Sequence, residues 1–241
     1  MKKKIFEYSF ALKESWVHLK SDRRKAILKA VKSIRYHREK LLEYIQRHPK
    51  FQFSLEPLKV DSSAPKVIKC MSEASIAARV GPMAAVAGAL ADLALEAMLN
   101  CDVNIAVVEN GGEIAAITDR PLYIAVISLN LKLLSNIGFK VTGADCPIGI
   151  ATSTGKGNHA LSFGEADSVT IVADTAALAD AAATSVGNTV IGTNVSLSLR
   201  KGLNKASKIP NVRGALIVRD EKVGFTGHLP EMIKIVDNNL F

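Results

Sequence analysis

Aromatic residues and cysteines are scarce in this chain, and each scarcity excludes a class of protein. Only 5% of the 241 residues are aromatic and none falls in a nucleic-acid-binding signature, so a base-stacking RNA-binding module is excluded. The three cysteines, Cys70, Cys101 and Cys146, are scattered and odd in number, which predicts neither a disulfide framework nor a zinc site. We therefore expect a reducing, cytoplasmic setting.

Long uninterrupted apolar runs are also missing. The most apolar stretch, residues 74–99, contains Arg79, Asp92 and Glu96, and the basic start of the chain is not followed by an apolar segment. No signal peptide or membrane span is predicted, and we expect no membrane partner. Because 48% of the residues are hydrophobic, the chain can bury a sizeable core, and we interpret residues 1–241 as a single domain.

Positive charge is abundant, with a net charge of +8, and much of it is concentrated in residues 21–48. Apolar residues recur there at helical spacing, which predicts a basic amphipathic helix that begins near Ser21 or Asp22. The basic face is either a solvated helix surface or a contact for phosphate-bearing ligands. Nucleic acid remains a minor alternative. The basic residues of this segment are Arg23, Arg24, Lys25, Lys29, Lys32, Arg35, Arg38, Lys40 and Arg47.

The order of strand-like and helical segments favours an α+β fold with a mainly antiparallel sheet and packed helices. A helical, small-residue-rich segment at 74–99 is broken near Gly81 and Pro82. The segments 114–117 and 122–128 resemble a hairpin joined by residues 119–121. Further strands are predicted at 5–19, 103–108, 146–152, 168–172, 214–219 and 223–226.

Two glycine-bearing segments allow a ligand to approach the backbone closely. Residues 80–92, VGPMAAVAGALAD, either form a tight helix-packing face, within the chain or in a dimer, or leave room for a ligand. Residues 109–113, ENGGE, follow a strand. Asn110, Gly111, Gly112 and Glu113 are therefore either a plain hairpin turn or a binding turn for a phosphate or a ring.

A third polar segment, TSTGKGNH, begins at Thr152. Its hydroxyls, its amides and Lys156 suit phosphate or a polar ring edge, although a solvated loop is the plain alternative. It is not a P-loop, because five residues rather than four separate Gly149 from Gly155, and Gly157 stands where Ser or Thr is needed. His159 is either a general base or a surface histidine.

A single carboxylate, Asp180, lies in the alanine-rich helical sequence that follows the apolar segment 168–172. Asp180 and Thr184 are four residues apart, so a helix presents a carboxylate and a hydroxyl on one face, where they can bind one cation. The alternative is a structural carboxylate paired with an arginine such as Arg79 or Arg120.

Taken in order, these segments resemble the ApbE superfamily, the magnesium-dependent transferases that join FMN from FAD to Thr or Ser of a protein. The similarity lies in MAAVAGALAD at 83–92, NGGE at 110–113, TSTG at 152–155 and ADAAAT at 179–184. The chain is still more similar to a poorly characterised ApbE-like branch from archaea and anaerobic bacteria. It departs from the transferases at Ala87, where they have a lysine, and after residue 159, where its loop is shorter.

The resemblance implies an ApbE-like fold and a set of site residues. Asp180, Thr184 and the carbonyl near Val86 are the implied magnesium ligands. Residues of the NGGE and TSTGK segments are the implied contacts of FAD or FMN, and His159 or Asp145 would deprotonate an acceptor. The implied nucleotide contacts are Asn110, Gly111, Gly112, Glu113, Thr152, Ser153, Thr154, Gly155 and Lys156.

Three functions stay open at this stage. The first is a protein that binds a flavin or another nucleotide diphosphate through a divalent metal, and that splits FAD to FMN and AMP if it is an enzyme. The second is a non-catalytic or accessory protein of sulfur assimilation and homocysteine formation in anaerobes. The third is a nucleic-acid binder that uses the basic helix. Metal-dependent FAD binding and AMP release separate the first two.

Overall fold

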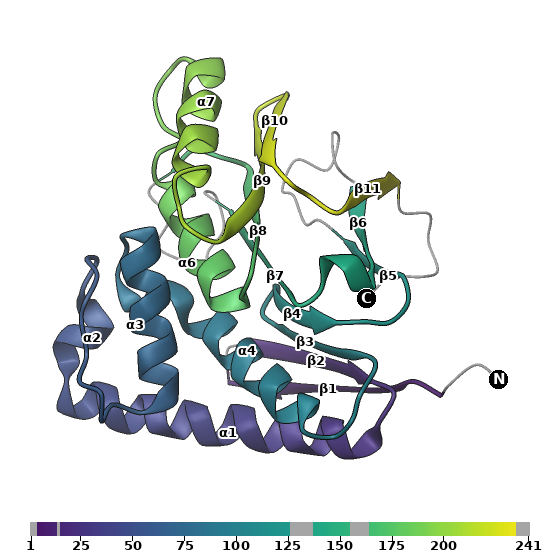
Figure 1. Ribbon diagram of the computed structural model, residues 1–241. Helices are drawn as coiled ribbons and strands as arrows, with labels where there is room; N and C mark the ends of the chain where they lie inside the picture. The colour runs from purple at the N-terminus through teal and green to yellow at the C-terminus, as the bar shows by residue number, and fades with distance from the viewer. Residues whose placement is uncertain (1–3, 14, 126–136, 155–163, 235–241) are drawn as a thin grey trace.

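The computed structural model describes residues 4–13, 15–125, 137–154 and 164–234, and Figure 1 traces their arrangement. Antiparallel strands form the sheets and helices pack on them, so the predicted α+β class with a mainly antiparallel sheet is confirmed. The chain does not repeat a regular strand–helix unit, because the described helices follow only two of the strands, β2 and β8, and the pairs β1–β2, β3–β4 and β9–β10 are joined by short turns.

Eight described strands form one antiparallel sheet in the order β1-β2-β3-β4-β7-β8-β9-β10. Its interior strand β8 is buried along its whole length, as expected for a strand covered on both faces. The strands are β1 (Phe6–Leu12), β2 (Ser15–Ser21), β3 (Ala106–Asn110), β4 (Glu113–Ile117), β7 (Ile148–Ser153), β8 (Ser168–Ala173), β9 (Val212–Arg219) and β10 (Lys222–Gly227).

A second sheet has the order β11-β6-β5, formed by β11 (Glu231–Lys234), β6 (Ile137–Val141) and β5 (Leu122–Ala125). The predicted hairpin between 114–117 and 122–128 is wrong, because β4 pairs with β3 and β7 whereas β5 pairs with β6. Thr118 Oγ1 donates to the carbonyl of Arg120 at 2.6 Å, in a turn where the chain passes from one sheet to the other. A strand with alternating apolar residues can bury one face in a hairpin-paired sheet or against a stacked sheet. The alternation therefore does not specify which strand it pairs with.

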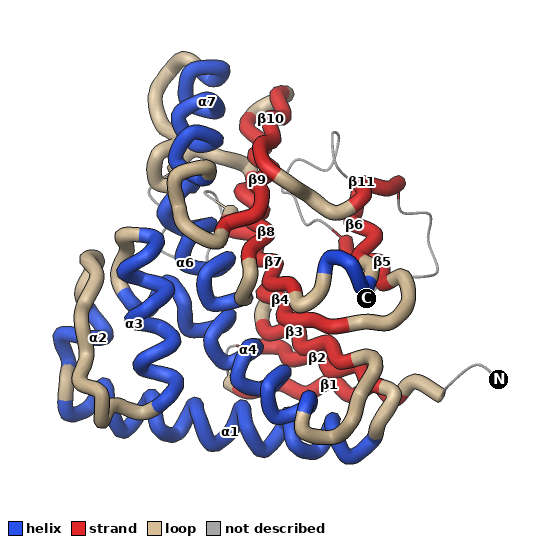
Figure 2. Tube along the Cα trace, viewed as in Figure 1, coloured by secondary structure: helices blue, strands red, loops and turns tan. Residues whose placement is uncertain are grey.

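Helices cover one face of the large sheet and the small sheet covers the other (Figure 2). The basic helix predicted around 21–48 is α1, and the predicted break near Gly81 separates α3 from the following helical turn. The helices are α1 (Arg24–Arg47), α2 (Pro49–Phe53), α3 (Lys66–Ala78), α4 (Val86–Leu99), α6 (Ala176–Gly187) and α7 (Val195–Ala206), with 3-10 turns η1 (Pro82–Ala85) and η2 (Gly143–Asp145).

Strand alternation divides the buried apolar residues into cores on the two faces of the large sheet. Ala151 and Ile171 face α3 and α6, whereas Ile150 and Val172 face the small sheet. A neighbouring core on the helical side joins β2 and β3 to α1 and α4. Because adjacent residues of a strand point to opposite faces, the sheet is buried on both sides over its central strands.

One described helical run, Pro82–Leu99, is long and apolar enough to cross a membrane by length and composition, with a mean hydropathy of 1.5. In this fold it is a core element: α4 packs against α1, α6 and strand β3, and 56% of the run is buried. The small residues Ala85, Ala89 and Ala91 are fully buried within the chain. The small-residue face predicted at 80–92 is therefore used for intrachain packing.

Candidate functional site

The first turns of α4 and α6 cross in close contact at Gly88. A Cβ built on Gly88 would lie 2.2 Å from the carbonyl oxygen of Ala176, so no larger residue fits without moving the backbone. Thr175 begins α6 as its N-cap, where its side chain accepts a hydrogen bond from the N–H of Leu178 at 3.2 Å. Glycine and alanine at this crossing bring the starts of the two helices together.

Each of these helices supplies a carboxylate to the start of the other. Asp92 of α4 accepts hydrogen bonds from the N–H groups of Ala176 (2.9 Å) and Ala177 (2.8 Å). Asp180 of α6 accepts one from the N–H of Gly88 at 3.0 Å, and a second from Ala87. The described partners of Asp180 are thus backbone amides, and not the arginines considered from the sequence.

The segment Asn110–Glu113 is a two-residue hairpin turn between β3 and β4, adjacent to this crossing. Gly111 and Gly112 both have positive φ, +72° and +111°, a conformation that strongly favours glycine. The buried side chain of Asn110 donates from Nδ2 to the carbonyl of Ala87 at 3.0 Å, which ties the turn to the first turn of α4. Both interpretations of this segment from the sequence are therefore compatible, because a hairpin turn can also line a site.

Two carboxylates of this group interact electrostatically. Burial raises the pKa of Asp180 to about 7, partly offset by the amides of Gly88 and Ala87. Burial, followed by the negative charge of Asp180, holds the pKa of Glu113 well above its usual range. Within the described residues no cationic side chain contributes to either shift. Among the described residues, carboxylates are therefore gathered here without a cationic side chain that lowers their pKa.

Hydroxyl and carbonyl oxygens are found on the same elements as these carboxylates or on the neighbouring strand β7. Thr184 follows Asp180 by one helical turn on α6 and is partly exposed, and Val86 is the first residue of α4. Ser153 ends β7 on the face that carries Ala151, toward the helices, and its buried Oγ has no hydrogen-bond partner among the described residues. The neighbouring Thr152 points to the opposite face, where its Oγ1 lies 2.9 Å from Thr170 Oγ1.

The carboxylate, hydroxyl and carbonyl oxygens of these residues are hard ligands of the kind that magnesium prefers. The Ser153 hydroxyl, which has no described hydrogen-bond partner, and the carboxylates, which have no described cationic partner, both fit a bound cation. Among the described residues, no group of three or more His, Cys, Asp or Glu side chains has a metal-binding arrangement. A cation at Asp180 would accordingly depend on hydroxyl and carbonyl oxygens besides carboxylates.

Not every predicted residue joins this group. Asp145 lies before β7, at the opposite end from Ser153, and β7 alone spans about 16 Å at a rise of ~3.3 Å per residue. Its carboxylate accepts hydrogen bonds from the N–H (2.7 Å) and the Oγ1 (2.8 Å) of Thr142 in a capping box. Thr154 follows β7 directly, whereas Gly155, Lys156 and His159 lie outside the described residues.

Asp92 was not among the residues predicted to form the site. Its signal was present in the sequence, because Asp92, like Asp180, is an acid within a run of apolar helical residues. Burial raises the pKa of Asp92 to about 6, with the amides of Ala177 and Ala176 acting in the opposite direction. Pairing with helix amides, which are remote in sequence, is the property that the sequence did not reveal.

Comparison with known proteins gives relatives along almost the whole chain. The family described as AbpE bacteria matches residues 4–208. A UPF0280 protein of Methanococcus maripaludis strain C7 is 39% identical over 233 residues, which cover 96% of this chain and 94% of that protein. Another, from Methanosarcina barkeri, is 37% identical over 226 residues, covering 93% and 88% of the two chains.

Solved structures with the same architecture include proteins named as flavin transferases. The apo form of the flavinyl transferase ApbE from Pseudomonas stutzeri matches with a TM-score of 0.60 at 13% identity, covering 94% of this chain and 96% of that one. The ApbE protein of Thermotoga maritima matches with a TM-score of 0.57 at 13% identity, covering 96% and 97%. At such identities the likeness establishes the ApbE-like fold, which confirms the resemblance seen in the sequence motifs.

Proposed function

We propose, from the premise that this chain belongs to the AbpE bacteria and UPF0280 families, that it binds a flavin nucleotide through a divalent cation. As an enzyme it would transfer the FMN part of FAD to a protein hydroxyl. The solved proteins that share its fold are named as flavin transferases, which supports the ligand class. The electrostatic interaction of Asp180 with Glu113, to which no cation in the described part of the chain contributes, is the observation that carries the proposal.

Asp180, Thr184 and the carbonyl near Val86 are the proposed ligands of the cation, with Glu113 beside them. The amide of Gly88 occupies one carboxylate oxygen of Asp180, and a carboxylate retains further lone pairs for a metal. A bound magnesium ion would neutralise negative charge on a diphosphate and on the departing AMP. Asn110 fixes the turn relative to α4, which keeps this cluster of oxygens in one arrangement.

The nucleotide would lie against Gly111 and Gly112 and the end of β7. A Cβ on Gly112 would have no heavy atom within 4 Å, so the backbone of this turn is open to a ligand. Ser153 and Thr154 add hydroxyls, and Gly155 and Lys156 remain proposed contacts from the sequence. In the transfer, the bond between the two phosphates of FAD breaks, a bond forms from the FMN phosphorus to the acceptor oxygen, and the acceptor proton and AMP are released.

Binding without transfer is the second candidate, in which the protein is an accessory of sulfur metabolism. The specific observation in its favour is Ala87, which stands where the flavin transferases have a lysine. In this structure both backbone groups of Ala87 are engaged, its carbonyl by Asn110 and its N–H by Asp180. A methyl group at this position supplies no charge to a phosphate. His159 is the proposed base if transfer occurs, whereas Asp145, the other base predicted from the sequence, lies at the far end of β7 with its carboxylate bound to Thr142.

The test uses the only tryptophan in the chain. The carbonyl of Trp16 accepts the N–H of Gly111 at 2.9 Å and its side chain is 63% exposed, so its fluorescence reports on ligands at the turn. Titration with FAD should quench Trp16 in magnesium but not in a chelator, and chromatography should detect AMP if FAD is split. Asp180→Ala should abolish the magnesium dependence, whereas Asp61→Ala, a change of an exposed loop acid, should preserve it.

The outcomes separate the candidates. Quenching with AMP release supports the transferase, and quenching without AMP release, also when acceptor peptides bearing Thr or Ser are added, supports the accessory role. Absence of metal-dependent FAD binding in the folded wild-type protein would overturn the leading proposal.

A further inference from the structure

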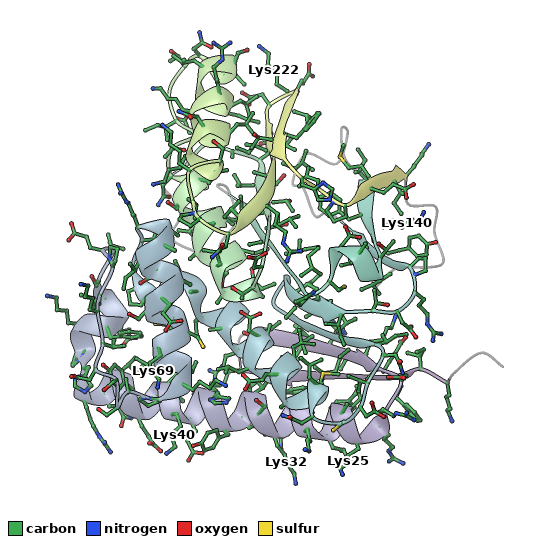
Figure 3. All side chains as sticks on the ribbon, in the orientation of Figure 1. Lys25, Lys32, Lys40, Lys69, Lys140 and Lys222 are labelled. Carbon is green, nitrogen blue, oxygen red and sulfur yellow. The ribbon has the colours of Figure 1, made fainter. Side chains whose placement is uncertain are left out.

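The outer face of α1 carries a row of cations on the side opposite the core. Ala26, Ile27, Ala30 and Ile34 are buried toward the sheet and α4. At 100° per residue, the opposite side of the helix between residues 25 and 36 presents only basic and apolar side chains. These are Lys25, Leu28, Lys29, Lys32, Arg35 and Tyr36, which we call the α1 outer face. Figure 3 shows Lys25 and Lys32 extending away from the body of the molecule.

The charges of the α1 outer face are unbalanced. Residues 23–38 contain no Asp or Glu, and the described residues form no ion pair with Lys25, Lys29, Lys32 or Arg35. Other lysines have carboxylate partners, as Lys40 has in Glu43 at 2.7 Å. Within α1, the described lysine–carboxylate pair therefore lies in the second half of the helix.

This distribution of charge is unfavourable for the helix itself. Like charges repeat along this face, four residues apart at Lys25 and Lys29 and three residues apart at Lys29 and Lys32. Such pairs destabilise an isolated helix. Arg24 and Lys25 also lie in the first turn, at the positive end of the helix dipole, where acidic residues are favoured. Helix stability alone does not explain such a sequence, whereas contact with an anionic partner does.

Apolar exposure on the same face distinguishes between anionic partners. Leu28 is 57% exposed and Tyr36 is 55% exposed, each flanked by cations. A nucleic-acid backbone offers no partner for an exposed leucine, and a single tyrosine provides no row of aromatic side chains for stacking bases. The interface of a lipid bilayer accommodates both kinds of residue, since aliphatic and aromatic groups enter the headgroup region while lysines contact anionic lipids.

We propose that the α1 outer face binds peripherally to an anionic lipid bilayer. The face is a straight part of a 24-residue helix that lies along one side of the molecule, so several cations can reach a flat surface together (Figures 1 and 3). Lipid binding by the α1 outer face does not depend on the proposed nucleotide site. That site lies at the first turn of α4, whereas the buried side of this part of α1 packs against the later turns of α4. The sequence-based expectation of no membrane partner rested on the lack of a spanning segment, and peripheral binding through the α1 outer face would replace that expectation.

The first test is sedimentation with vesicles of phosphatidylcholine, with and without about one-third phosphatidylglycerol, over a range of salt concentrations. Binding should require the anionic lipid and weaken with salt. Lys25→Gln/Lys29→Gln/Lys32→Gln should weaken it by roughly a hundredfold, given the contribution of each lysine near such a surface. Arg200→Gln/Lys201→Gln/Lys208→Gln removes the same charge from another exposed region, at and beyond α7, and should bind like wild type. Circular dichroism confirms that both variants are folded.

The second test separates insertion from simple electrostatic attraction. In a Trp16→Phe background, Tyr36→Trp places one fluorophore on the face, and its emission should shift to the blue on anionic vesicles. Equal binding of the two triple-substituted variants, no vesicle binding by the wild type at low salt, or no shift in emission would overturn the proposal. Competition by duplex DNA or structured RNA at lower concentration than by anionic lipid would assign the face to nucleic acid and also overturn it.

Discussion

Asp92 and Asp180 bind reciprocally to the first turns of each other's helices. Asp92 on α4 accepts the amides of Ala176 and Ala177, while Asp180 on α6 accepts the amides of Gly88 and Ala87. A helix leaves its first N–H groups without intrahelical partners, and an anion is favoured there by the dipole. The two carboxylates therefore connect α4 and α6, and they hold Asp180 beside the hairpin turn at Gly111.

Asp92→Ala should destabilise the protein by about 2 kcal/mol, because it leaves two amides of α6 without an acceptor. Asp92→Asn keeps one carbonyl oxygen as an acceptor and should cost roughly half as much. Urea unfolding, followed by circular dichroism, measures both values. If Asp92→Ala and Asp92→Asn were both as stable as the wild type, the amides of Ala176 and Ala177 would not need this acceptor.

The raised pKa of Asp180, about 7, predicts how stability depends on pH without metal. The folded state holds the proton more tightly than the unfolded chain, whose Asp titrates near 3.8, so this contribution is complete below about pH 4. It is lost as the pH rises through about 7. Asp180→Asn should remove this component, on the order of 1 to 2 kcal/mol between pH 5 and 8 after allowance for partial exposure.

Melting temperatures at pH 5 and pH 8 in a chelator provide the measurement for Asp180. Magnesium favours the ionised carboxylate, so it should raise the melting temperature of the wild type mainly at pH 8 and leave Asp180→Asn unchanged. A wild-type protein and an Asp180→Asn variant with identical pH profiles would contradict the assignment of the shift to this residue.

Glu113→Gln should have opposite effects with and without magnesium. In a chelator, at a pH high enough to ionise Glu113 despite its raised pKa, it removes a negative charge that Asp180 repels, so the free energy of unfolding should increase slightly. With magnesium it removes a negative charge beside the ion, and the affinity should fall by roughly tenfold. Magnesium titrations followed by Trp16 fluorescence and by melting temperature measure both. Asp61→Asn is the control, because it removes an exposed loop carboxylate that contributes to neither raised pKa.

Gly88→Ala should destabilise the fold more than Gly202→Ala, although both glycines lie in helices and gain the same helix propensity. A Cβ on Gly88 meets backbone atoms of Ala176 at 2.2 Å and 2.4 Å, which cannot move independently of α6. A Cβ on Gly202 meets side-chain ends of Val190 and Ile217, at 2.7 Å and 2.8 Å. We expect a cost of about 3 kcal/mol or more at Gly88 and about 1 kcal/mol at Gly202, measured by urea unfolding.

Local patterns in the sequence were sufficient for several elements of the fold. The apolar periodicity of residues 24–47 predicted α1, and the paired glycines at 111 and 112 predicted a turn, which joins β3 to β4 in the structure. These features depend on contacts close in the chain. The pairing of β5 did not follow in the same way, because alternation along a strand fixes which residues are buried but not which sheet covers them.

The same distinction between local pattern and tertiary contact applies to the candidate site. The sequence by itself determined that Asp180 and Thr184 share a helix face, that Gly111 and Gly112 form a turn, and that the chain resembles the ApbE family. Only the tertiary structure decided that Asp180 caps α4, that its charge meets that of Glu113, and that Asp145 lies at the other end of β7. The reason is physical: periodicity follows from local backbone geometry, whereas pairing between carboxylates and remote amides follows from how the helices cross on the sheet.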